Sequence, residues 1–231
     1  MQKRTVAGVT AVAAAGALAA GIVSLAQERR VDDLVRADFF AGFAGNSDAL
    51  ERGMRLTEEM LEADPGNAAA LVWHGAGTFF RSGASFESGD FRTGIALWEQ
   101  GLTEMARAVE MAPDDVEVLI PRGANLIVGS RFVPPAQAEE ILRTGVADFE
   151  RVLELQAPYF SRLGVHARGE LLTGLADGWS RLGDREAARR YFERIVDELE
   201  GSVYEQKARA WLEDRPEARE PGFFECSGCH R

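Results

Sequence analysis

Residues 174–192 read GLADGWSRLGDREAARRYF and hold the best-formed copy of an arrangement that recurs along the chain. Each copy places a small residue in a run whose apolar positions return every three or four residues, the spacing of one helix face. The small residue stands at Gly53, Gly101, Gly145 and Ala188, at spacings of 48, 44 and 43 residues. A nearly fixed period in this range is typical of a solenoid of helix pairs.

Two further copies indicate where a helix should end. Residues 101–113 read GLTEMARAVEMAP, and residues 145–158 read GVADFERVLELQAP. Leu102, Met105 and Val109 recur at helical spacing, and the proline that closes each copy cannot continue a helix. The recurring Gly or Ala is expected to let a neighbouring helix approach closely.

A partner helix is expected after each of these stops. The partner helices are predicted over 31–43, 68–83, 115–131, 165–182 and 203–213. Pro121 should kink or delay the third of them, residues 82–90 should form a long connection, and Pro134-Pro135 should start a helix. No alternating strand pattern occurs, so we predict an all-α solenoid of about four helical hairpins plus a closing helix.

The copy at 174–192 resembles the tetratricopeptide repeat (TPR). In that family a small residue packs the first helix, a Gly-Asp pair makes the turn, and an Ala followed by an aromatic residue packs the second helix. In this copy the turn is Gly183-Asp184, and the residues expected to pack the second helix are Ala187 and Phe192. The other copies are looser, and their period exceeds the family's 34 residues. The resemblance covers about 31–213, within a repeat domain predicted at 27–214, and implies a scaffold whose concave face binds another protein or peptide, without catalysis.

Residues 1–26 have the pattern of a secretory signal peptide. Lys3 and Arg4 precede an uncharged run rich in Ala, Gly and Val, and Ser24-Leu25-Ala26 offers small residues for cleavage. The alternative is an uncleaved membrane anchor, although the run is only weakly hydrophobic. The cleavage point carries no cysteine, so a lipoprotein is not expected. We therefore predict a periplasmic or extracellular protein.

The charge balance is acidic. The chain has 26 Lys and Arg against 37 Asp and Glu, a formal net charge of −11, and removal of the predicted signal leaves 24 against 37, or −13. A nucleic-acid-binding protein would show a basic stripe instead. The balance also disfavours docking on anionic lipid, so we expect neither nucleic acid nor, after signal cleavage, a membrane as partner.

The last residues carry the chain's only recognisable chemistry. Residues 223–231 read FFECSGCHR, and Cys226 and Cys229 are the only cysteines of the chain. Cys-x-x-Cys-His is the attachment motif of c-type haem, because two cysteines three apart can reach the two vinyl groups of one porphyrin. We predict one covalent haem c, with His230 as the proximal iron ligand. Residues 215–231 form the predicted tail, in which 216–222 should be an extended linker.

Other interpretations of the tail have less support. A thioredoxin-like redox pair needs a βαβ context, and a zinc site needs further ligands nearby. Phe223 and Phe224 could cover a porphyrin or could anchor the tail on the solenoid. Since only Arg231 follows the motif, the haem would have to pack against the solenoid, another subunit or a separate partner.

The sixth iron ligand is left open by the sequence. His166 is the preferred candidate because it opens a predicted helix, and His74 is the second choice. Four methionines could supply sulfur but lie in the apolar pattern of the repeats and are expected to fill the core: Met54, Met60, Met105 and Met111. Water or a partner's side chain could also occupy this position.

These expectations combine into one functional hypothesis. The chain should be an exported monohaem c-type cytochrome that transfers electrons through protein–protein contacts, with redox partners or with copies of itself in a haem-bearing oligomer or filament. The alternative is a haem-free scaffold that assembles an envelope complex. A third interpretation is a peroxidase-like enzyme, which would need an open iron site with polar distal residues that a sequence cannot show. We expect an electron-transfer or binding protein rather than a catalyst.

Overall fold

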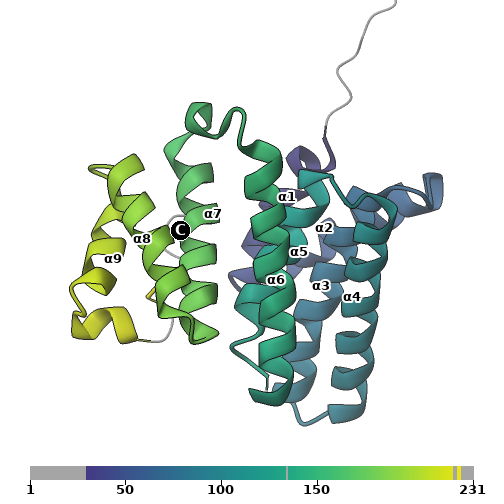
Figure 1. Cartoon of the computed structure of the whole chain (residues 1–231). Coiled ribbons are helices and arrows are strands. Elements are labelled where there is room, and N and C mark those ends of the chain that lie inside the picture. The colour runs from purple at the N-terminus through teal and green to yellow at the C-terminus, as the bar shows by residue number, and fades with distance from the viewer. Residues whose placement is uncertain (1–29, 134, 221–222, 225–231) are drawn as a thin grey trace, which may run out of the picture.

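The computed structural model describes residues 30–133, 135–220 and 223–224. Within these ranges it contains nine α-helices and two short 3-10 helices, and no strand (Figure 1). The helices are α1 Val31–Phe43, α2 Ser47–Ala63, α3 Ala68–Glu87, α4 Phe91–Met111, α5 Val116–Gly129, α6 Pro135–Gln156, α7 Val165–Arg181, α8 Arg185–Glu198 and α9 Val203–Leu212. The 3-10 helices are η1 Phe160–Arg162 and η2 Pro216–Arg219.

Consecutive helices pack as pairs. The main contacts join α1 with α2, α3 with α4, α5 with α6, and α7 with α8, and α9 packs on α8. In Figure 1 the pairs stand side by side, with α4 at the right of the view and α9 at the left. The predicted all-α solenoid of four hairpins and a closing helix is therefore confirmed.

Polar side chains start most of the helices. An Asn, Asp or Ser side chain accepts a backbone N–H in the first turn at Asn46, Asn67, Asp90, Asp115, Asp184 and Ser202. Each such cap contributes about 1 kcal/mol to helix stability. Between α7 and α8, Gly183 takes a φ of +86° and Asp184 accepts the N–H of Ala187 at 2.8 Å, which makes the turn tight.

The structure differs from two local predictions and agrees with a third. Residues 82–90 do not form a long connection, because α3 continues to Glu87 and the ring of Phe86 packs where Gly94 has no side chain. Pro121 does not delay α5, which starts at Val116 behind the Asp115 cap and runs through the proline. The helix after the Pro134-Pro135 pair begins at Pro135, as predicted.

The core consists of two hydrophobic clusters that share helix α5. Val118 and Leu126 of α5 belong to the cluster formed mainly by α1 to α4. Leu119 and Ile127, one residue further along in each case, belong to the cluster of α6 to α9. Because neighbouring residues on a helix point in different directions, α5 is buried on two sides and joins the two halves.

Glycines allow the paired helices to approach at backbone distance. A Cβ on Gly101 of α4 would lie 2.6 Å from the backbone nitrogen of Phe79 and 2.7 Å from the carbonyl oxygen of Gly75, both on α3. Gly123 and Gly145 repeat this arrangement between α5 and α6, where a Cβ on Gly145 would lie 2.9 Å from the carbonyl oxygen of Gly123. The predicted role of the recurring small residue is confirmed at these pairs.

None of the helices in the described part of the chain is both long and apolar enough to cross a membrane.

We expect Gly101→Ala to lower the free energy of unfolding by about 1–3 kcal/mol, because the new methyl group meets rigid backbone rather than a mobile side chain. Chemical denaturation followed by circular dichroism measures this change. Gly83→Ala is the matched control, since a Cβ at that position in α3 meets nothing within 4 Å. The control should keep the stability or raise it by up to about 1 kcal/mol. Equal losses in both variants would contradict the close-approach explanation.

Candidate functional site at the root of the C-terminal tail

The predicted haem-binding residues Cys226, Cys229 and His230 lie outside the described residues, as does the predicted signal peptide 1–26. The last described residues before the motif are Phe223 and Phe224. The surroundings of these two phenylalanines define the part of the body from which the tail emerges, and we take this region as the candidate site.

The segment after α9 is held against the body. Asp214 turns the chain with a φ of +54°, and η2 then packs on α9. Residues 216–219 are therefore a 3-10 helix and not the start of an extended linker. The ring of Phe224 lies 5.1 Å from that of Phe192, and Phe223 packs edge-on against Phe224 at 5.0 Å. These ring contacts anchor the tail on the solenoid, which is one of the two roles considered for the aromatics.

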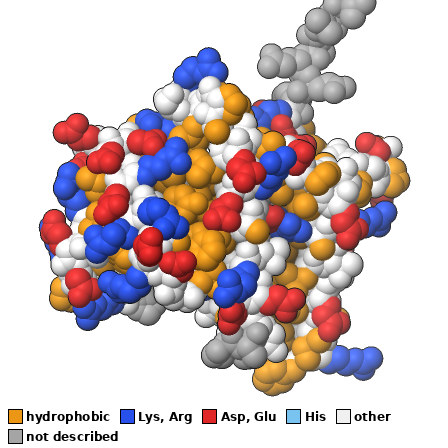
Figure 2. All heavy atoms as spheres, in the orientation of Figure 1, with side chains coloured by type: hydrophobic (Ala, Val, Ile, Leu, Met, Phe, Trp, Pro, Cys, Tyr) orange, Lys and Arg blue, Asp and Glu red, His pale blue; other side chains and the backbone are white. Residues whose placement is uncertain are grey.

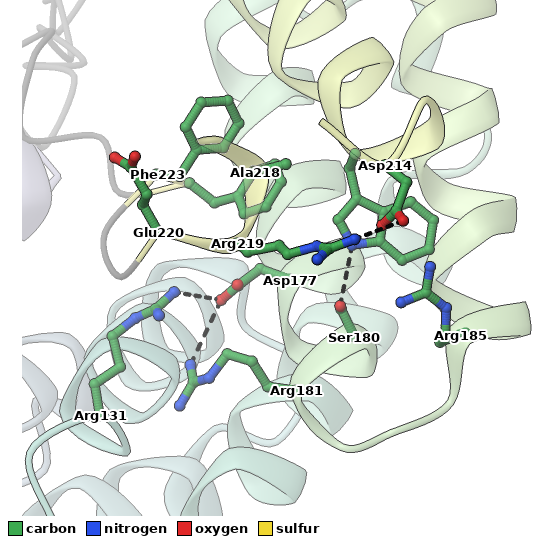
Figure 3. A pocket seen from close by; sticks show the side chains of 12 residues that line it. Arg131, Asp177, Ser180, Arg181, Arg185, Asp214, Ala218, Arg219, Glu220 and Phe223 are labelled. Atoms are coloured by element: carbon green, nitrogen blue, oxygen red, sulfur yellow. Dashed lines mark hydrogen bonds and ion pairs between the residues drawn. The ribbon is translucent and has the colours of Figure 1, made fainter. Parts of the chain in front are cut away.

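An open cavity of about 390 Å³ lies beside this anchor (Figure 3). Its wall is formed by the last turn of α7, the first residue of α8, the end of α9, η2 and the two phenylalanines. Figure 3 shows Ala218 and Phe223 on one side of the cavity, Arg131 and Arg181 on the opposite side, and Arg185 to the right. The cavity thus combines apolar surface with several guanidinium groups.

Trp211 links the cavity to the core. Its ring is stacked on that of Phe192 at 4.5 Å, and its Nε1–H donates to Ser180 Oγ at 3.2 Å. The guanidinium of Arg185 lies over the Trp211 ring, 4.9 Å from the ring centre. Such a cation–π contact holds the arginine at the cavity without neutralising its charge.

A network of ion pairs fixes the other wall of the cavity. Arg131, which follows α5, donates to the buried carboxylate of Asp177 on α7 at 2.6 Å. Arg181 donates to Ser130 Oγ at 2.6 Å and lies 3.5 Å from Asp177. These charge-assisted bonds tie the α5–α6 connection to α7 and hold this wall in place.

His166, the preferred candidate for the sixth ligand, is not part of the cavity. It lies on the first turn of α7, about 20 Å along the helix from Ser180 at a rise of 1.5 Å per residue. Its Nδ1 is 2.9 Å from Tyr204 Oη, whose O–H donates to Glu170 at 2.8 Å. The structure therefore places His166 at the opposite end of α7 from the root of the tail.

His74, the second choice, lies between two carboxylates in the other half of the molecule. Its Nδ1 is 2.7 Å from Glu104 of α4, and its Nε2 is 3.7 Å from Glu58 of α2. The hydrogen bond to Glu104 raises the pKa of His74 above its ordinary value, although partial burial acts in the opposite direction. The arrangement fits a charged clamp between α2, α3 and α4, far from α9 in Figure 1.

The candidate methionines also lie in the N-terminal half. Met54 and Met105 are buried in its core cluster, Met60 packs against that cluster, and Met111 is partly exposed at the end of α4. The two buried residues fill the core, as the helical spacing suggested. In the described ranges no group of three or more His, Cys, Asp or Glu side chains could hold a metal ion.

The residues that line the cavity are not apparent from the sequence. Arg131 and Asp177 are 46 residues apart, and Arg181 and Ser130 are 51 residues apart. Both separations are close to the length of one repeat, so a comparison of charges at equivalent positions in neighbouring repeats could have suggested these contacts. No protein-family model, curated protein or solved structure matches the chain. Its function must therefore be argued from the chemistry of its own residues.

The His74 clamp predicts a pH-dependent stability. Because folding raises the pKa of His74, its stabilising effect is complete below the unfolded value of about 6.5 and is lost as the pH rises through the folded value. Glu104→Gln removes the main cause of the shift. The free energy of unfolding should therefore differ more between wild type and this variant at pH 6 than at pH 9.

Urea denaturation at the two pH values measures the effect. Glu110→Gln is the control, since Glu110 is exposed on the same helix. The difference between the control and wild type should be the same at both pH values. If Glu104→Gln behaved like the control, the charged clamp would be refuted.

Proposed function

We propose that this chain is an exported c-type cytochrome that carries one covalent haem behind a TPR-like helical scaffold and transfers electrons through contacts with other proteins. The observation that carries the proposal is that both cysteines of the chain fall in the motif Cys226-Ser-Gly-Cys229-His230. Cys226 and Cys229 would hold the haem through thioethers, and the imidazole of His230 would bind the iron. The bound haem would supply a reversible one-electron couple.

The donor set fits this group. Two thiols at this spacing can each add to one vinyl group, and no leaving group is needed. The region from which the tail emerges also fits a haem. The neighbouring cavity offers aromatic surface from Phe224 and the exposed edge of Trp211, together with guanidinium groups. An apolar macrocycle with two carboxylate side chains needs both kinds of contact. The cavity residues lie in the described part of the chain, so the support that they give does not depend on where the cysteines lie.

The surface of the body supports the part of the proposal that concerns protein partners. Phe132 is 78% exposed and Phe91 is 64% exposed, and exposed aromatic side chains are common at protein contacts. Figure 2 shows hydrophobic side chains gathered along the middle of one face, with acidic and basic groups mixed around them. Such a surface suits redox partners or further copies of the chain better than a polyanion.

The decisive experiment is production of the full chain with a cytochrome c maturation system. We expect an intact mass increased by one haem and an absorption spectrum that persists after denaturing extraction. Reduction and reoxidation should change the spectrum reversibly. Cys226→Ser combined with Cys229→Ser should abolish covalent attachment, since each thioether needs its thiol, while the helical content stays unchanged.

Ser227→Ala is the matched control for this test. It alters a position between the cysteines and leaves both thiols and the imidazole in place, so the haem should remain attached. A colourless wild-type protein of unmodified mass would refute the cytochrome proposal and favour the haem-free scaffold that assembles an envelope complex.

A further inference from the structure

Four arginines line the cavity at the root of the tail, against three acidic residues: Arg131, Arg181, Arg185 and Arg219 face Asp177, Asp214 and Glu220. This local excess of positive charge stands in a chain whose formal net charge is −11. A positively charged site on an acidic protein is most simply explained by an anionic ligand.

Three of the arginines already have a carboxylate partner. Arg131 binds Asp177 at 2.6 Å, and Arg219 binds Asp214 at 2.6 Å. Arg181 lies 3.5 Å from Asp177 and also donates to the carbonyl oxygen of Ile127 at 2.8 Å. Their charges are largely compensated within the protein.

Arg185 differs from these three. Its guanidinium lies over the Trp211 ring at 4.9 Å, and no carboxylate among the described residues pairs with it. The residue opens α8 and is exposed. A guanidinium held over an aromatic ring keeps N–H groups that can bind a carboxylate through two parallel hydrogen bonds.

The chemistry beside Arg185 defines the ligand further. Phe224 and the exposed edge of Trp211 line the cavity, so the cavity suits the edge of a planar apolar group that carries a carboxylate. Only Glu225 separates Phe224 from Cys226, and two residues of extended chain span at most about 7 Å. Chain length alone therefore keeps the attachment point Cys226 within about 7 Å of Phe224, which lines the cavity.

We propose that Arg185 binds a propionate of the haem carried by the tail, and that Phe224 and the exposed edge of Trp211 provide apolar contact for the edge of the macrocycle. This inference rests on the proposed function. It selects the solenoid itself, and not another subunit, as the surface against which the haem packs. Arg185 is thus a positioning residue that also adds a positive charge near the iron.

The test compares Arg185→Gln with Arg190→Gln in the haem-loaded full chain. Arg190 lies on the same helix, is exposed and pairs with Glu186 at 3.2 Å, outside the cavity. Removing a cation next to the haem stabilises the oxidised iron, which has the higher positive charge. We therefore expect a lower midpoint potential in Arg185→Gln and an unchanged one in Arg190→Gln, measured by spectroelectrochemical titration.

A second readout follows the propionate itself. A carboxylate bound to Arg185 remains ionised over a wide pH range, whereas without the arginine it should take up a proton more readily on reduction. The midpoint potential of Arg185→Gln should therefore depend more strongly on pH between 5 and 8 than that of wild type. Arg185→Lys should have a midpoint potential between those of Arg185→Gln and wild type, because lysine keeps the positive charge but cannot form the two parallel hydrogen bonds.

The outcomes separate the two proposals. Haem content should be the same in all variants, since attachment depends on the cysteines. If haem is attached but Arg185→Gln and Arg190→Gln have the same potential and pH dependence, the propionate contact is refuted alone. If no variant, wild type included, carries haem, the proposed function is refuted and this inference with it.

Discussion

Backbone contact between paired helices is the constraint on which the fold depends. At Gly101 and Gly145 a single methyl group would collide with main-chain atoms of the partner helix, and at Gly75 and Gly123 it would meet a side chain of that helix at 2.9 and 2.5 Å. Close approach brings the flanking apolar residues into mutual contact, so the hairpin becomes a unit with one continuous apolar face. The spacing of 44 residues between Gly101 and Gly145 places such a residue in each of these two hairpins.

Helix α5 connects the two halves of the molecule. Leu126 and Ile127 are adjacent in sequence but belong to different core clusters, so displacement of α5 would disturb both halves. Arg131, just beyond the same helix, then reaches Asp177 on α7. The wall of the C-terminal cavity is thus held by a helix whose other side packs in the N-terminal half.

The candidate site could be predicted only in part from the sequence. The Cys226 to His230 motif is contiguous, and its chemistry follows from residue types and spacing, so it is visible without a structure. Arg185 and Trp211 are not near it in the chain, and neither has an unusual local pattern. His166 was chosen for accessibility at a helix start, but accessibility does not indicate at which end of α7 a residue lies relative to the tail.

Helical periodicity, proline stops and the recurring small residue were sufficient to predict the fold class and the order of the hairpins. These signals are local, and each acts within one or two turns of helix. A contact such as that of Arg185 over Trp211 joins residues whose separation in sequence has no fixed relation to distance. Which charges meet, which remain uncompensated and where the tail is anchored depend on how the hairpins stack, because stacking sets the distances between side chains of different repeats.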